Sequence, residues 1–288
     1  MNDSRRERVA VAIGQARTHE PCLQFACAEA LRAGRPIQLV HVAEGDSTTV
    51  AQRRLNTIAE DVQAITRGMV PVETLVGTGP VVPTLIELSK DVDLLVLQRR
   101  QLSRLRRQVT GSLSAQVAGQ AHTPTVSVPE GWRPRGGDAR RVTLGFDGAD
   151  SDERTRLLRH AFARASERQP DQVRAELTVV HAWHLPSGYD DAIVDQRAVR
   201  EWRDRYEGAL HDVLKPLQSR HGLVATTVDI QHLEPAEALI QAARDSDLVV
   251  LARGRLEHPL VGHLGSVARA VLRDAACPVE VINEGHVA

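Results

Sequence analysis

Residues 247–283, DLVVLARGRLEHPLVGHLGSVARAVLRDAACPVEVIN, contain the pattern that decides the fold. The apolar run Leu248–Ala252 is too short for a helix and has the β-branched character of a buried parallel strand. A polar loop follows, and after Gly265-Ser266 apolar residues recur at helical spacing. A second short apolar strand, Val279–Ile282, closes the stretch. The pattern therefore predicts a strand–loop–helix–strand unit.

The predicted helix begins at a pair of small residues, Gly265-Ser266, followed by Val267. Such a start brings free backbone N–H groups, the positive end of the helix dipole and a hydroxyl to one point. A phosphate group fits at such a point. Helix capping is the alternative explanation for Ser266, and also for Ser112 in a related segment described next.

The same unit occurs twice in the chain. Residues 93–128, DLLVLQRRQLSRLRRQVTGSLSAQVAGQAHTPTVSV, repeat its order of strand, loop, helix and strand at a constant offset of 154 residues. A repeat of this length indicates a duplicated domain and not a solenoid. The matched pairs are Asp93 with Asp247, Gly111-Ser112 with Gly265-Ser266, and Pro124 with Pro278.

Both halves alternate short apolar strands with helical segments, which predicts parallel sheets with helices on both faces. Glu130–Asp138 is rich in proline, glycine and charge and is expected to be a linker. The predicted domains are therefore residues 1–129 and 139–288.

Composition excludes several classes of partner. A hydrophobic content of 42% and a charged content of 25% are typical of a globular protein. A net charge of −1 and an aromatic content of 3% argue against nucleic acid and anionic membranes. No apolar stretch approaches a membrane span, and three cysteines show no metal-ligand spacing. We expect a cytoplasmic protein that binds no membrane, no nucleic acid and no metal by itself.

Three features, taken together and in order, resemble the universal stress protein (UspA-like) family. The first strand of the second half ends in Asp, the second ends in the pair His-Ala, and the fourth leads through a glycine-containing loop to Gly-Ser. The resemblance covers nearly the whole chain as a tandem of two domains. It is carried by TLGFDGADSDE (143–153), VVHAWHLP (179–186) and HLGSVARAVLRDAACPVEVI (263–282).

For the fold, the resemblance implies an α/β protein with two tandem flavodoxin-like (adenine nucleotide α-hydrolase-like) domains. Each would have a five-stranded parallel sheet in the order 3-2-1-4-5 with right-handed crossovers. The fifth strands, Thr125–Val128 and Val279–Ile282, are then sheet edges, which need covering. We expect the two copies to pair through these edges as an intramolecular pseudo-dimer. Association into a homodimer stays open.

For the site, the resemblance implies ATP or another adenine nucleotide bound where strands one and four end. In relatives that bind ATP, the strand-one Asp contacts the adenine side, a backbone group after strand two lies near the ring, and the glycine loop holds the phosphates. The matching residues of the second copy are Asp147, Ala182, Gly265, Ser266 and Val267.

The chain departs from the family pattern at the loop glycines. In the second copy Ala252 and Arg255 stand at the two glycine positions, and Gly254 is one residue out of register. An Arg there either obstructs a phosphate or supplies a charged contact to it. In the first copy Gly14 replaces the Asp, and glutamines, Gln98 and Gln101, replace both glycines. We therefore expect a nucleotide site in the second copy only.

These residues favour a non-catalytic universal stress protein with a degenerate nucleotide site in its C-terminal domain. The alternative is a ligand-free protein-interaction module in which both sites have decayed. An enzyme of the wider nucleotide α-hydrolase group is disfavoured, because its Ser-Gly-Gly loop and His-Ile-Gly-His-type motif are missing. An arginine-rich segment is either an anion trap, for a nucleotide phosphate or an acidic partner, or, as we favour, a solvated loop: Arg99, Arg100, Arg104, Arg106 and Arg107.

Two smaller expectations concern histidine and cysteine. His41 and His181 lie at the ends of the second strands, so both copies are expected to need the same local packing or polar contact. Cys22 and Cys277 lie in or beside apolar helix faces and are expected to be small core residues.

Overall fold

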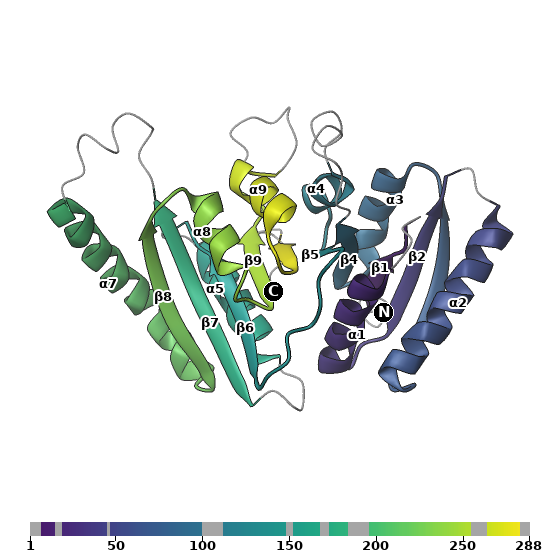
Figure 1. The fold of residues 1–288 in the computed structure, drawn as a ribbon, viewed down its shortest axis with the longest axis horizontal. Coiled ribbons are helices and arrows are strands. Elements are labelled where there is room, and N and C mark those ends of the chain that lie inside the picture. The colour runs from purple at the N-terminus through teal and green to yellow at the C-terminus, as the bar shows by residue number, and fades with distance from the viewer. Residues whose placement is uncertain are drawn as a thin grey trace.

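The computed structural model of the chain describes residues 7–14, 19–44, 47–99, 112–147, 152–167, 173–183, 196–254 and 264–282. In these residues the strands form one ten-stranded sheet with the order β3-β2-β1-β4-β5-β10-β9-β6-β7-β8 (Figure 1). Strands β1 to β5 come from the first copy and β6 to β10 from the second. Each copy therefore has the predicted order 3-2-1-4-5, and the α/β class is confirmed.

The elements alternate in both copies as the sequence predicts. The first copy contains β1 (Val9–Ala12), α1 (Glu20–Ala33), β2 (Ile37–Ala43), α2 (Thr48–Thr66), β3 (Val72–Thr78), α3 (Val81–Leu88), a 3₁₀ turn η1 (Ser89–Asp91), β4 (Leu94–Arg99), α4 (Leu113–Ala118) and β5 (Thr125–Pro129). The second contains β6 (Ala139–Gly145), α5 (Asp152–Ser166), β7 (Arg174–Trp183), α7 (Gln196–Arg220), β8 (Val224–His232), α8 (Pro235–Ala242), β9 (Leu248–Ala252), α9 (Ser266–Asp274) and β10 (Val279–Ile282).

The two copies meet edge to edge, as expected for a pseudo-dimer within one chain. Strand β5 pairs with β10 in antiparallel orientation, and Val126 lies opposite Glu280. All other neighbouring strands in the described residues pair in parallel. Because Val126 and Glu280 are matched positions of the repeat, the pseudo-twofold axis of the molecule passes between them.

Helices cover both faces of the sheet, which explains the continuous apolar runs in its strands. Helices α1, α2, α5 and α7 lie on one face, and α3, α4, α8 and α9 on the other (Figure 1). In β1, Val9 and Val11 are buried in the core of the first face, whereas Ala10 is buried in that of the second. The core of the first face runs through both copies without a break.

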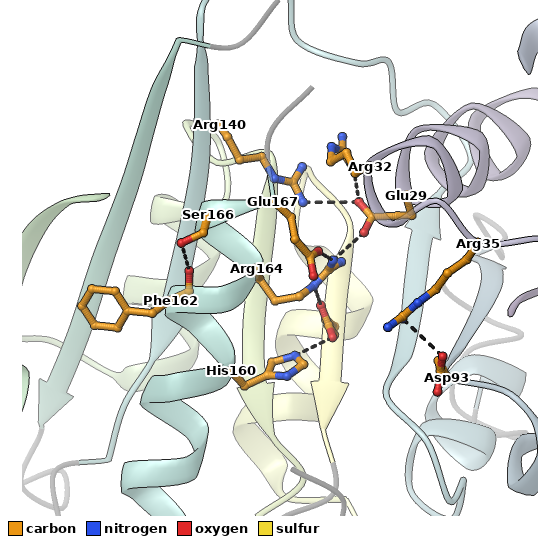
Figure 2. A network of polar contacts seen from close by, with 11 residues as sticks. Glu29, Arg32, Arg35, Asp93, Arg140, His160, Phe162, Arg164, Ser166 and Glu167 are labelled. Atoms are coloured by element: carbon orange, nitrogen blue, oxygen red, sulfur yellow. Dashed lines mark hydrogen bonds and ion pairs between the residues drawn. The ribbon is translucent and has the colours of Figure 1, made fainter. Parts of the chain in front are cut away.

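A buried network of charges crosses the junction beside the paired edges (Figure 2). Glu29 of α1 accepts from Arg140 of β6 at 3.3 Å and pairs with Arg164 of α5 at 2.6 Å. Arg164 Nε also donates to Glu280 at 2.8 Å, and His160 Nε2 contacts the other oxygen of Glu280 at 2.8 Å. The side chains of the two Glu and the two Arg are at most 7% exposed. The first copy thus supplies a carboxylate that the arginines of the second copy require.

Charge pairing keeps both carboxyl groups ionised in spite of their burial. Burial by itself raises the pKa of Glu29, but the guanidinium groups of Arg164, Arg32 and Arg140 outweigh it and lower that pKa to about 2. Burial likewise raises the pKa of Glu280, and Arg164 and His160 lower it to about 2. Removing one partner would leave a buried charge without compensation.

Replacing Glu29 with Gln is therefore expected to lower the free energy of unfolding by about 3–5 kcal/mol. The matched control is Glu73→Gln, because Glu73 forms an ion pair with Arg8 while its side chain is 52% exposed. That control should cost only about 0–1 kcal/mol. Urea denaturation of both variants and the wild type measures the difference, and equal losses would contradict a special role for the buried network.

The same network predicts the acid sensitivity of the protein. Both pKa values are about 2 in the folded protein, below the ordinary value of 4.5 that holds in the unfolded chain. The stabilisation is therefore fully present above pH 4.5 and is lost as the pH falls from there toward about 2. Thermal unfolding midpoints recorded from about pH 7 to about pH 3 should fall steeply once the pH is below 4.5. The fall should be shallower in Glu29→Gln, and identical slopes would show that Glu29 does not carry the effect.

Candidate functional site

A cavity of about 320 Å³ lies in the second copy where β6 and β9 end, at the point where the strand order reverses. This is the usual ligand position in an open α/β sheet. Its wall includes every site residue that the sequence indicated: Asp147 after β6, Ala182 on β7, and Gly265, Ser266 and Val267 at the start of α9. The fold thus brings together residues that are up to 120 positions apart in the chain.

The start of α9 forms one side of the cavity. Gly265, which has no side chain, is the N-cap, and Ser266 is the first helical residue. The first bond of the helix runs from Arg269 N to Gly265 O, so the amides of the first turn have no partner inside the helix. Capping was the wrong explanation for Ser266. It was right for Ser112, whose Oγ accepts from Ala115 N at 3.2 Å.

A glycine does lie beside this helix start, although the sequence put it out of register. Gly254 lines the cavity with φ +89°, in the left-handed region that favours glycine. A Cβ added there would lie 3.5 Å from Gly265 Cα, so the two backbones approach closely. Ala252 also lines the cavity, whereas Arg255 lies outside the described residues. Gly254 therefore provides the close backbone approach to Gly265 that the family pattern assigns to position 255.

Asp147 faces the cavity, but it already has a cationic partner. Both of its carboxylate oxygens accept from the guanidinium of Arg154, which lies in the first turn of α5 and also lines the cavity. The Asp147 side chain is 70% exposed, so the pair is open to solvent. A ligand that contacts Asp147 must share it with Arg154 or displace that side chain. Arg154 was not predicted from the sequence; its place in the first turn of the helix that follows Asp147 is the signal that could have found it.

The matched histidines make the same contact in both copies, as expected. His41 Nδ1 lies 2.7 Å from Ile13 O, and His181 Nδ1 lies 2.9 Å from Phe146 O. Each contact ties the second strand to the end of the first. In the second copy it fixes the backbone immediately before Asp147.

Arg99 does not belong to a solvated loop. Its guanidinium crosses to the second copy and donates to Leu272 O at 2.7 Å and to Ala275 O. The expectation of a solvated segment or an anion trap is wrong for this residue, because the end of β4 points it at the neighbouring helix. The other arginines of that segment, from Arg100 to Arg107, lie outside the described residues.

The cysteines are core residues, as expected. Cys22 and Cys277 are buried, and burial raises the pKa of each thiol to about 12. Within the described residues no group of three His, Cys, Asp or Glu side chains could hold a metal ion. In the same part of the chain no helix has the length and apolar character needed to cross a membrane.

The fold and site define a class: a tandem α/β protein whose two flavodoxin-like domains share one sheet, with a cavity at the switch point of the second. The sequence model of the universal stress protein family matches residues 5–129 and 139–283. The chain therefore belongs to the universal stress protein family, with two copies of its domain.

Individual relatives agree with this assignment. A universal stress protein of Mycobacterium tuberculosis is 32% identical over 207 residues, which span 70% of this chain and 62% of that protein. The chain thus matches less than two thirds of the length of this relative. A universal stress protein of Mycolicibacterium smegmatis is 27% identical over 297 residues and is matched over 96% of its length, with 95% of this chain.

Solved structures show the same fold at low sequence identity. A functionally unknown protein of Pseudomonas aeruginosa has a TM-score of 0.68 at 16% identity, covering 99% of this chain and 96% of its own. A universal stress protein of Archaeoglobus fulgidus has a TM-score of 0.64 at 16% identity, covering 96% of each chain.

The close approach of Gly254 can be tested by substitution. Gly254→Ala should lower the free energy of unfolding by about 1–2 kcal/mol, because an L side chain is strained at this φ. Gly136→Ala is the control, since a Cβ at Gly136 meets nothing within 4 Å, and it should change stability by less than about 0.5 kcal/mol. Thermal denaturation compares the two, and an equal effect would show that Gly254 is under no constraint.

Proposed function

We propose that this protein is a non-catalytic, cytoplasmic stress-response protein whose second domain, residues 139–288, binds ATP or another adenine nucleotide. Residues 1–129 form the first domain, which has no such site in this proposal. The observation that carries it is the convergence of five residues from three elements on one cavity: Asp147, Ala182, Gly265, Ser266 and Val267. Three buried cysteines without a disulfide support the cytoplasmic location.

The charges of the cavity suit a phosphorylated ligand. The first-turn amides of α9 and the positive end of its dipole favour an anion beside Gly265. Arg154 and Arg253 also line the cavity, with their guanidinium groups bonded to Asp147 and to Ala121 O of the first copy. The phosphates would lie at this end, where the backbone N–H groups in the first turn of α9 would donate to them.

The opposite wall suits the nucleoside. It is apolar, with Val180 and Ala182 of β7 and Leu239 of α8. Asp147 stands at its rim and would accept from the nucleoside hydroxyl or amino groups. A volume of about 320 Å³ is within the range of small-ligand sites.

The absence of catalysis is part of the proposal. A nucleophile needs a base within hydrogen-bond distance and a group that orients the base. Ser166 and His221 are 3.1 Å apart, but neither lines the cavity, and the Ser166 hydroxyl donates to Phe162 O at 2.8 Å. The Asp147 carboxylate is engaged by Arg154 and is poorly suited to act as a base.

The alternative function is a ligand-free interaction module. The observation in its favour is the Asp147–Arg154 pair, which satisfies the carboxylate that a nucleoside would need. Titration of the protein with ATP, described next, distinguishes the two functions.

Isothermal titration with ATP tests the proposal through Gly265. Its φ is −60° and an added Cβ would lie no closer than 3.8 Å to Arg253 O, so both Asn and Asp can occupy the N-cap. We expect saturable binding by the wild type, retained binding by Gly265→Asn, and at least a roughly tenfold loss in Gly265→Asp, whose carboxylate repels phosphate. Asp147→Ala should also weaken binding.

Thermal denaturation of the same samples provides the control, because Asp at an N-cap should not destabilise α9. Equal losses in Gly265→Asn and Gly265→Asp would indicate a steric effect and not an anion site. If the wild type releases no heat with ATP, the ligand-free module replaces the nucleotide-binding function.

A further inference from the structure

The two copies exchange arginine contacts that follow the pseudo-twofold axis. Arg99 at the end of β4 donates to Leu272 O at 2.7 Å and to Ala275 O, where α9 of the second copy ends. Arg253 follows β9 at the position that matches Arg99, 154 residues later. It donates to Ala121 O of the first copy, and Ala121 in turn matches Ala275. Each copy therefore places a guanidinium at the helix end of the other.

The contact at α9 satisfies groups that a helix leaves without partners. The last carbonyls of an α-helix accept no bond within it and form the negative end of its dipole. The last turn of α9 closes with Ala275 N donating to Val271 O. The planar guanidinium of Arg99 donates to two nearby carbonyl groups through two of its nitrogens, which are held in a fixed geometry.

The first copy also contacts the other end of the same helix. Leu264, which directly precedes the N-cap Gly265, is buried and shares an apolar cluster with Ala118 of α4. A Cβ added to Gly119 would lie 3.6 Å from Leu264 Cβ. Helices α4 and α9 lie side by side where the two halves meet (Figure 1). The first copy thus holds α9 at both ends.

We propose that the first copy is a positioning unit for the cavity of the second, and that Arg99 is its positioning residue. By fixing the end of α9, Arg99 sets the place of the Gly265–Val267 helix start, which lines the cavity. Arg99 itself does not line that cavity, so its effect is transmitted through the helix. The identity of the ligand rests on the proposed function; the anchoring of α9 does not.

The reciprocal contact reinforces this role. Arg253 lines the cavity while its guanidinium donates to Ala121 O. The wall of the second-copy site is therefore attached to the first copy at Arg253 as well as through α9. This gives the first copy a function although Gly14 stands where the second copy has Asp147.

Hydrogen exchange of the full chain without ligand tests the anchoring. In Arg99→Gln the amides of α9 should exchange about tenfold faster than in the wild type, because two charged hydrogen bonds are lost. Arg99→Lys keeps the charge but loses the planar fork of donors, and it should be intermediate. Arg53→Gln, which removes the same charge from an exposed position on α2, should leave α9 unchanged. The amides of β6 and β7 should be unaffected in all variants.

Titration with ATP then tests the effect on the site. Arg99→Gln should bind about tenfold more weakly than the wild type, with Arg99→Lys between them and Arg53→Gln equal to the wild type. Unchanged α9 exchange in Arg99→Gln, or equal acceleration in β6 and β7, would overturn the inference. So would faster α9 exchange with unchanged affinity. If the wild type binds no ATP, the proposed function fails, whereas the exchange rates still decide whether the first copy anchors α9.

Discussion

The antiparallel contact between β5 and β10 is the constraint on which the rest of the structure depends. In a twofold pairing of identical sheet edges, the residue on the axis faces its own copy. With Glu at that position on both strands, two buried carboxylates would oppose each other at high cost. Here Val126 faces Glu280 instead. Duplication within one chain has allowed the two edges to differ, so a single carboxylate lies at the axis.

That carboxylate is neutralised by Arg164 and His160 of its own copy, within a network that also includes a carboxylate of the first copy. Arg164 of the second copy bridges Glu280 of its own copy and Glu29 of the first. Arg140 adds a second buried cation that also pairs with Glu29. A second domain paired with another of its kind would lack Glu29 and keep both arginines. The network is therefore complementary between unlike copies, and it favours pairing of the first copy with the second.

The sequence predicted what is encoded locally. Leu248–Ala252 and Val279–Ile282 agree with the observed strands residue for residue, because short apolar runs between turn residues have few alternatives. The strand order and the edge pairing came from the family resemblance. The five site residues were named from the family resemblance; they lie after β6, near the end of β7 and at the start of α9, which is the switch point of the sheet.

The contacts that the sequence did not predict join charged residues from distant elements. Arg154 bonds Asp147 over seven positions, Arg99 reaches Leu272 over 173 positions, and Arg164 reaches Glu29. No periodicity marks such pairs, and a charged residue on a helix or after a strand is most simply expected to face solvent. The buried ionic network could not be predicted from the sequence for the same reason.

The positions of the site pattern in the first copy are different from the residues that join the two copies. Site residues can therefore change while the fold persists. In the first copy the Asp position at Gly14 and the loop position at Gln98 belong to the site pattern, but neither takes part in the β5–β10 pairing. Arg99 follows Gln98 directly and serves the junction instead. Substitutions at Gly14 and Gln98 therefore leave the β5–β10 pairing, the ionic network and the Arg99 contacts to α9 intact. A duplicated domain with this arrangement is free to become a ligand-binding copy and a supporting copy.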